Sequence, residues 1–75
     1  MNEYITIDPH ILVGKPVIKG TRIPVTLILN LLAHGHTVKN ILDDYPNLTE
    51  PALIAAIKYA EDQLNREEIH LTETI

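Results

Sequence analysis

The amino-acid sequence predicts a small, mainly α domain in which three helices follow a short N-terminal β ribbon. Up to residue 23, short runs of β-forming residues alternate with Pro and Gly, whereas from Pro24 onward apolar residues recur at helical spacing. A chain of 75 residues has room for one domain. Because a core of this size is marginal alone, we expect help from a second copy.

The N-terminal segment predicts two short strands. Residues 4–7 alternate in polarity and are rich in β-formers, and Asp8-Pro9 ends this strand. A turn at residues 14–16 leads to a second strand at residues 17–19. Since Pro16 has no backbone N–H, these strands form an edge or a two-stranded ribbon, which needs a helix or a second subunit behind it.

A first helix is expected over residues 24–34. Pro24 suits the first turn of a helix, and Gly35 is a typical C-terminal signal. Between them the apolar residues form one broad face, which consists of Leu27, Ile28, Leu31 and Leu32.

Two further helices follow, and each has a Thr at its predicted N-cap. Thr37 caps the second helix, which Pro46-Asn47 ends, and Thr49 caps the third. The second helix is predicted to bury Val38, Ile41, Leu42 and Tyr45. The third is predicted to bury Leu53, Ile57, Ala60 and Leu64.

Three helices with tight connections are typical of a trihelical helix-turn-helix arrangement. A plain three-helix unit that only packs remains an equal alternative, because short turns between helices are common in proteins that do not bind DNA. We expect one domain over residues 1–64, with a β arm at residues 1–23, and a C-terminal tail at residues 65–75. The alternating tail suits a strand that adds to another chain, or a frayed terminus.

The sequence predicts no catalytic site, metal or cofactor, and we expect the protein not to be an enzyme. It contains neither Cys nor Ser, which excludes cysteine nucleophiles, serine triads and thiolate metal ligands. In residues 14–21 Lys19 precedes Gly20, whereas a phosphate-binding loop has the Gly directly before the Lys. His34 and His36 are better explained by a solvated helix end than by a zinc site. Asp43 and Asp44 are better explained by a solvated face than by a carboxylate pair for magnesium or acid-base chemistry.

The charge distribution indicates where an anionic partner would bind. The net charge of −4 argues against a general binder of nucleic acid or of membranes. Residues 1–24 nevertheless carry +1, and residues 25–75 carry −5. The basic cluster is Lys15, Lys19 and Arg22, which a two-fold dimer would duplicate; ordinary solubilising charge is the alternative. No apolar run is long enough for a membrane span, and we expect a cytoplasmic protein.

Residues 14–25 carry a long and unusual block, GKPVIKGTRIPV. Together with residues 8–11, 32–35 and 44–49, this block resembles a small prokaryotic family. That family was long catalogued as a domain of unknown function and is now regarded as predicted VapB-like antitoxins of type II toxin-antitoxin modules. The resemblance covers residues 4 to about 62 and implies a homeodomain-like helix-turn-helix fold, a homodimer and a neighbouring PIN-like ribonuclease toxin.

The resemblance gives the hypothesis of an antitoxin that inhibits its toxin sterically and binds operator DNA as a dimer. Operator DNA would be contacted by Lys15, Lys19 and Arg22. The toxin would be contacted by Ile69, Leu71 and Ile75. The dimer contact or the strand-to-helix junction would include Ile5, Ile7, Val17, Ile18, Gly20 and Thr21. The alternatives are a stand-alone helix-turn-helix regulator without a toxin and a purely structural interaction module.

Overall fold

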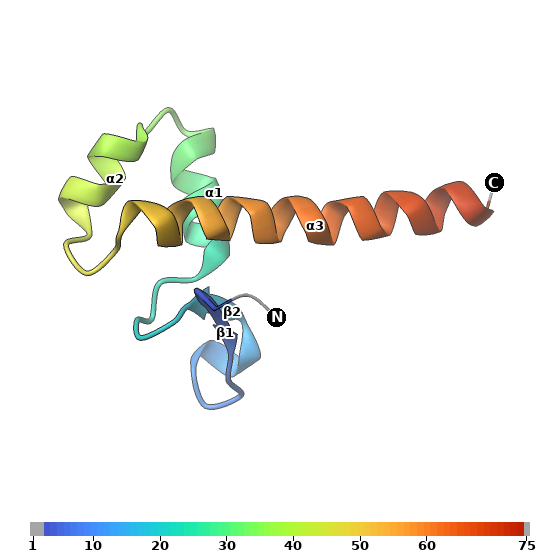
Figure 1. Cartoon of the computed structure of the whole chain (residues 1–75), viewed down its shortest axis with the longest axis horizontal. Coiled ribbons are helices and arrows are strands. Elements are labelled where there is room, and N and C mark those ends of the chain that lie inside the picture. Colours follow the sequence, from blue (N-terminus) through green and yellow to red (C-terminus); the bar gives the residue numbers. More distant parts are fainter. Residues whose placement is uncertain (1–2, 75) are drawn as a thin grey trace.

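The computed structural model describes the backbone of residues 3–74 and the side chains of residues 3–66. Over this range the chain forms a two-stranded N-terminal ribbon and three α-helices, and the domain is mostly helical (Figure 1). The elements in chain order are β1 (Ile5–Ile7), a 3-10 turn (Leu12–Gly14), β2 (Pro16–Ile18), α1 (Val25–Ala33), α2 (Val38–Asp44) and α3 (Glu50–Thr74).

The predicted ribbon is confirmed, with a shift at its second strand. β1 and β2 pair antiparallel, so that Ile5 is opposite Ile18 and Ile7 is opposite Pro16. Pro16 therefore begins β2 instead of ending the turn. A proline is tolerated there because it is the first residue of a strand in a two-stranded sheet. Next to the ribbon, Val17 also makes an isolated bridge with Pro24.

The loop between the strands is tightened by a turn of unusual handedness. The side chain of Asp8 accepts a hydrogen bond from the backbone N–H of His10 at 2.8 Å. Leu12, Val13 and Gly14 then follow with φ values of 49°, 57° and 78°. Three successive left-handed residues are rare outside glycine, because the Cβ atom crowds the backbone there.

The helix boundaries agree with the predicted caps. α1 ends in a Schellman motif, in which the N–H of His36 donates to the carbonyl of Leu31 and that of Gly35 to Leu32. A capping box begins α2: the Thr37 hydroxyl accepts from the Asn40 N–H at 3.1 Å, and the Asn40 side chain accepts from the Thr37 N–H at 3.2 Å.

The core lies where α1, α2 and α3 meet the ribbon, and it is aliphatic. Within residues 3–66 no polar or charged side chain is buried. The largest fully buried side chains come from four different elements and are Val17, Ile28, Ile41 and Leu53. Because β2 contributes directly to this core, the helices of the same chain support the ribbon.

α3 differs from expectation in its second half. The predicted stripe is confirmed at Leu53, but Leu64 is 59% exposed, so α3 does not bury this position in its own chain. Beyond Asn65 the alternating sequence suits a strand that adds to another chain or a frayed terminus, whereas the backbone continues as α3 to Thr74. At about 1.5 Å per residue α3 is about 37 Å long, and its C-terminal part projects away from the rest of the chain (Figure 1).

Candidate interaction surfaces

The three predicted DNA-contacting residues lie around β2 and before α1. Lys15 directly precedes β2, Lys19 directly follows it, and Arg22 lies in the connection to α1. All three are exposed. Among the side chains of residues 3–66, the ion pair is formed by Lys39 and Asp43, whose Nζ and Oδ2 atoms lie 3.6 Å apart. None of the three basic residues is therefore neutralised by a carboxylate within the described part of the chain.

The connection from β2 to α1 is held by Gly20 and Thr21. Gly20 has a φ of 80°, a conformation that side chains with a Cβ rarely adopt. The Thr21 hydroxyl donates to the Ile18 carbonyl at 2.8 Å and accepts from the Ile23 N–H at 3.0 Å. A further backbone bond joins the N–H of Ile18 to the carbonyl of Ile23 at 2.9 Å. At this connection Gly20 provides the left-handed backbone and Thr21 provides the hydrogen bonds.

The apolar ribbon residues divide into two groups. Ile5, Val17 and Ile18 are buried within a single chain, and Ile5 and Ile18 pack in the same core cluster as its helices. They are therefore occupied in the core and do not present a free surface. Ile7, by contrast, is 58% exposed. Of the four apolar ribbon residues assigned to a dimer contact or junction, Ile7 is the one that a second chain can reach without a rearrangement of the core.

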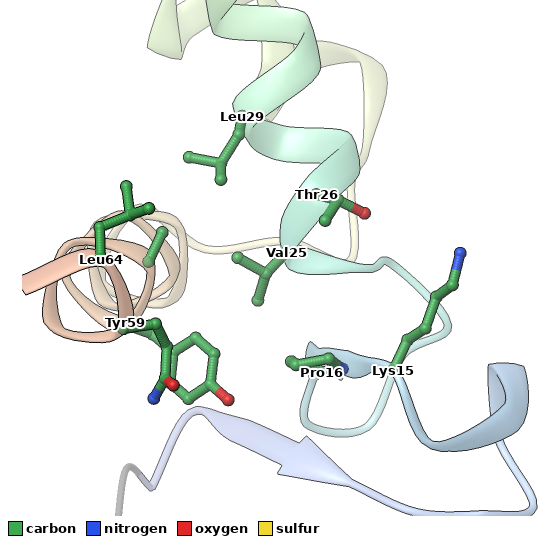
Figure 2. Close-up of a pocket in the computed structure, with 9 residues that line it drawn as sticks. Lys15, Pro16, Val25, Thr26, Leu29, Tyr59 and Leu64 are labelled. Carbon is green, nitrogen blue, oxygen red and sulfur yellow. The ribbon is translucent and has the colours of Figure 1, made fainter. Parts of the chain in front are cut away.

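An apolar groove of about 340 Å³ lies between α1, α3 and the start of β2. Figure 2 shows Leu29 directed from α1 toward α3 and Tyr59 directed from α3 toward Pro16. Lys15 lies at the edge of the groove, beside Pro16 (Figure 2). The full lining consists of Lys15, Pro16, Val25, Thr26, Leu29, Tyr59, Ala60, Gln63 and Leu64.

Sequence reasoning missed this groove because it assigned Leu64 to the buried stripe of α3. A signal was present in the spacing, since Ile57, Leu64 and Leu71 are seven residues apart. This signal is weak, because a helix that pairs with another helix usually has a second apolar position in each heptad, whereas Glu67 and Glu68 lie between Leu64 and Leu71. The contribution of Leu29 and Tyr59 had no comparable signal, because their meeting depends on how α1 and α3 cross.

A second, more open hollow of about 410 Å³ lies on another side of α3. It is lined by Tyr4, Glu50, Pro51, Ile54, Ala55 and Lys58. Ile54 is 50% exposed there. Glu50 lies in the first turn of α3, where a negative charge is favoured by the helix dipole but would repel a phosphate.

The predicted toxin-contacting residues lie at the end of α3. Ile69 and Leu71 belong to the helix, but their side chains lie outside the described residues, as does Ile75 altogether. In a strand, alternate positions share one face, whereas in a helix positions two apart point about 200° apart. The backbone therefore removes the reason for treating Ile69 and Leu71 as members of one strand face.

The described residues also bear on metal binding and on membrane spans. Among these residues no three His, Asp or Glu side chains gather as metal ligands. The Nδ1 atom of His34 instead donates to the carbonyl of Asn30 at 2.7 Å, at the end of α1. None of the helices described is both long enough and apolar enough to cross a bilayer.

These features define a small helical domain with a β-ribbon arm, a basic exposed segment and an open apolar groove. The chain belongs to the family described as "Protein of unknown function (DUF433)", whose model matches residues 5–60. The match extends from β1 into α3 and ends before Leu64.

The chain is also similar to one curated protein and to one solved structure. The chain is 41% identical over 59 residues to the uncharacterized protein y4eO of Sinorhizobium fredii. That alignment covers 79% of this chain but 27% of the relative, so the chain spans about a quarter of that protein. The crystal structure of a DUF433 member from Anabaena variabilis is similar, with a TM-score of 0.75 and 37% identity over 85% of this chain and 66% of that one.

Proposed function

We propose that this protein is the antitoxin of a type II toxin-antitoxin module. In this proposal a homodimer binds a PIN-like ribonuclease encoded beside it in the cytoplasm and inhibits the enzyme by covering its substrate site. The proposal rests on the block at residues 14–25, which resembles that of predicted VapB-like antitoxins and lies within the DUF433 match.

The observation that carries the steric mechanism is the length of α3. This helix runs over 25 residues, and the core that it helps to form extends only as far as Ala60. Its C-terminal part projects from the domain (Figure 1). A projecting helix can lie along a groove of a partner protein, which is a common mode of recognition. We assign toxin binding to this part of α3, including Ile69 and Leu71.

We further infer that α1, α2 and α3 act as a homeodomain-like helix-turn-helix unit, with Tyr45 to Leu48 as the turn. The N–H of Leu48 donates to the carbonyl of Tyr45 at 2.9 Å within that turn. DNA binding through α3 is disfavoured by Glu50 at its start. We therefore assign phosphate contact to the exposed cluster Lys15, Lys19 and Arg22, which a dimer presents twice.

The acidic total charge sets an expectation for the strength of DNA binding. With a net charge of −4 per chain, the isolated dimer should bind its operator weakly and with strong salt dependence. We expect the affinity to rise when the toxin is bound, if the toxin brings positive charge to the complex. This would couple autoregulation of the operon to the amount of toxin.

Co-expression with the adjacent gene tests the toxin partnership. We expect the two products to purify together as a stable complex and the ribonuclease to be inactive within it. Recovery of this chain free of its neighbour, from cells that contain both in soluble form, would refute the proposal.

The second candidate is a stand-alone regulator that binds DNA without a toxin partner. It is favoured by the three exposed cations around β2, none of which is held in an ion pair within residues 3–66. This candidate predicts salt-dependent operator binding by the isolated protein and no stable complex with the neighbouring gene product. The co-purification result therefore separates the two candidates.

A further inference from the structure

We propose that two copies of this chain pair through the groove between α1 and α3, with Leu64 of each copy inserted into the groove of the other. The proposal deepens the homodimer assumed in the proposed function, because it names the surface through which the dimer forms. It also moves the interface away from the ribbon, whose residues Ile5, Val17 and Ile18 are already buried within one chain.

The first argument is the continuity of the apolar stripe on α3. Leu53, Ala56, Ala60 and Leu64 follow one another at spacings of three or four residues and therefore lie on one side of the helix. The first two are buried in the core, and Ala60 packs at its edge. The same stripe then emerges from the domain, so that Leu64 is 59% exposed. The surface that packs against α1 is thus continued beyond the core without a cover.

The second argument is the self-complementarity of the groove. Its walls are Val25 and Leu29 on α1 and Tyr59 on α3, and Leu64 lines the same groove (Figure 2). A two-fold axis that passes near Leu64 would place the exposed side chain of each copy against the apolar walls of the other. Such an isologous contact uses the same patch twice and closes after two copies.

The third argument is charge complementarity at the rim. Lys15 lies at the edge of the groove and has no ion pair among the described side chains (Figure 2). Glu61 is exposed and precedes Leu64 by three residues, so it borders the apolar stripe. When Leu64 enters the partner's groove, Glu61 approaches the partner's Lys15. Asp62 lies on the opposite side of α3, about 200° from Ala60, and cannot make this contact.

These observations favour a second copy over a small molecule. Leu64 forms part of the groove wall although more than half of its surface is open to solvent. Small-molecule sites are usually enclosed and place a few polar groups to orient the ligand, and no polar side chain of residues 3–66 is buried here. A second α3 provides both the apolar side chain and the acidic rim that match this groove.

Light scattering of the full chain over a range of concentrations tests the proposal. We expect a dimer for the natural sequence, and at least about a tenfold rise in the dissociation constant for Leu64→Glu, because a charge would enter the apolar groove. The matched control is Ile54→Glu, which makes the same change at a position of similar exposure, 50%, on another side of α3. This variant should remain as dimeric as the natural protein.

A charge exchange provides a second test that does not depend on the fold of the Leu64 variant. Lys15→Glu should weaken the dimer about fivefold, which corresponds to the loss of a partly exposed ion pair. Addition of Glu61→Lys to the same chain should restore the dimer, whereas addition of Asp62→Lys should not.

The proposal is overturned if the natural chain is a monomer at every concentration. It is equally overturned if Leu64→Glu and Ile54→Glu have the same effect, or if both charge exchanges give the same result. Because these measurements use the isolated chain, they fail or succeed independently of toxin binding. A monomer that still neutralises the neighbouring gene product would contradict this interface and the homodimer of the proposed function, but would leave the inhibition of the toxin intact.

Discussion

The Thr21 hydroxyl donates a hydrogen bond of 2.8 Å to the carbonyl of Ile18, the last residue of β2. The same oxygen accepts from the N–H of Ile23, which lies just before α1. One side chain therefore connects the end of the ribbon to the start of the helical core. This contact explains in physical terms why Thr follows Gly20 in the block at residues 14–25.

Replacement of Thr21 by Val should destabilise the fold. The change keeps the shape of the side chain but removes its hydrogen bonds and leaves the Ile23 N–H without its acceptor, which costs about 1–2 kcal/mol. The free energy of unfolding in urea measures this loss. Thr6→Val is the control, because the Thr6 side chain makes no hydrogen bond among the described residues and lies outside the groove. Equal effects of the two substitutions would refute the role of the Thr21 hydroxyl.

Gly20→Ala should also destabilise the fold, through the backbone. Gly20 has a φ of 80°, and an added Cβ meets no heavy atom within 4 Å, so the cost comes from conformation alone. We expect a loss of about 1 kcal/mol in the free energy of unfolding. Gly20→Asn should lose less than Gly20→Ala, because Asn tolerates the left-handed region better. The reverse order would show that the left-handed backbone is not the cause.

Val13→Asn should stabilise the protein. Val13 has a φ of 57°, which is unfavourable for a β-branched residue, and its side chain is 94% exposed, so its removal sacrifices almost no burial. We expect a gain of about 0.5–1 kcal/mol, which thermal unfolding detects as a higher Tm. A lower Tm for this variant would mean that the left-handed turn at residues 12–14 is not adopted in solution.

The basic cluster should control DNA binding. Changing Lys15, Lys19 and Arg22 together to Glu should abolish the mobility shift with the upstream region of the operon, at protein concentrations where light scattering shows that the variant is still a dimer, because each contact releases counterions from phosphate. The matched control changes the other three Lys and Arg residues of the chain, Lys39, Lys58 and Arg66, to Glu, so that both triple variants have the same net charge. If both triple variants lose the shift equally, net charge explains binding and the assignment of contact residues is wrong.

The helical core was predictable from sequence because its signals are local. Thr37 and Gly35 mark helix ends through hydrogen bonds and backbone angles that depend on the residue type itself. The Thr49 cap is confirmed in the same way, since its hydroxyl accepts from the N–H of Ala52 at 3.3 Å. The handedness of the turn at Leu12 and Val13 had no such signal, since these residue types normally avoid positive φ.

The end of α3 and the groove were not predictable for a different reason. The alternation of Ile69, Leu71 and Ile75 with polar residues suits a strand or a frayed terminus, but a strand needs a partner, whereas a helix satisfies its backbone internally. Leu64 has the spacing of a core residue, and only the relative positions of α1 and α3 show that it lies beyond the core. Such information is tertiary and is absent from the local pattern.

The central claim, that this DUF433 member is an antitoxin, is tested most directly by cell growth. The adjacent gene is induced alone and together with this chain, and growth is followed over several generations. If the chain is an antitoxin, the neighbour alone arrests growth and the natural chain restores it. A neighbour that is harmless alone, or that still arrests growth in the presence of equal amounts of this folded chain, would show that the chain is not its antitoxin.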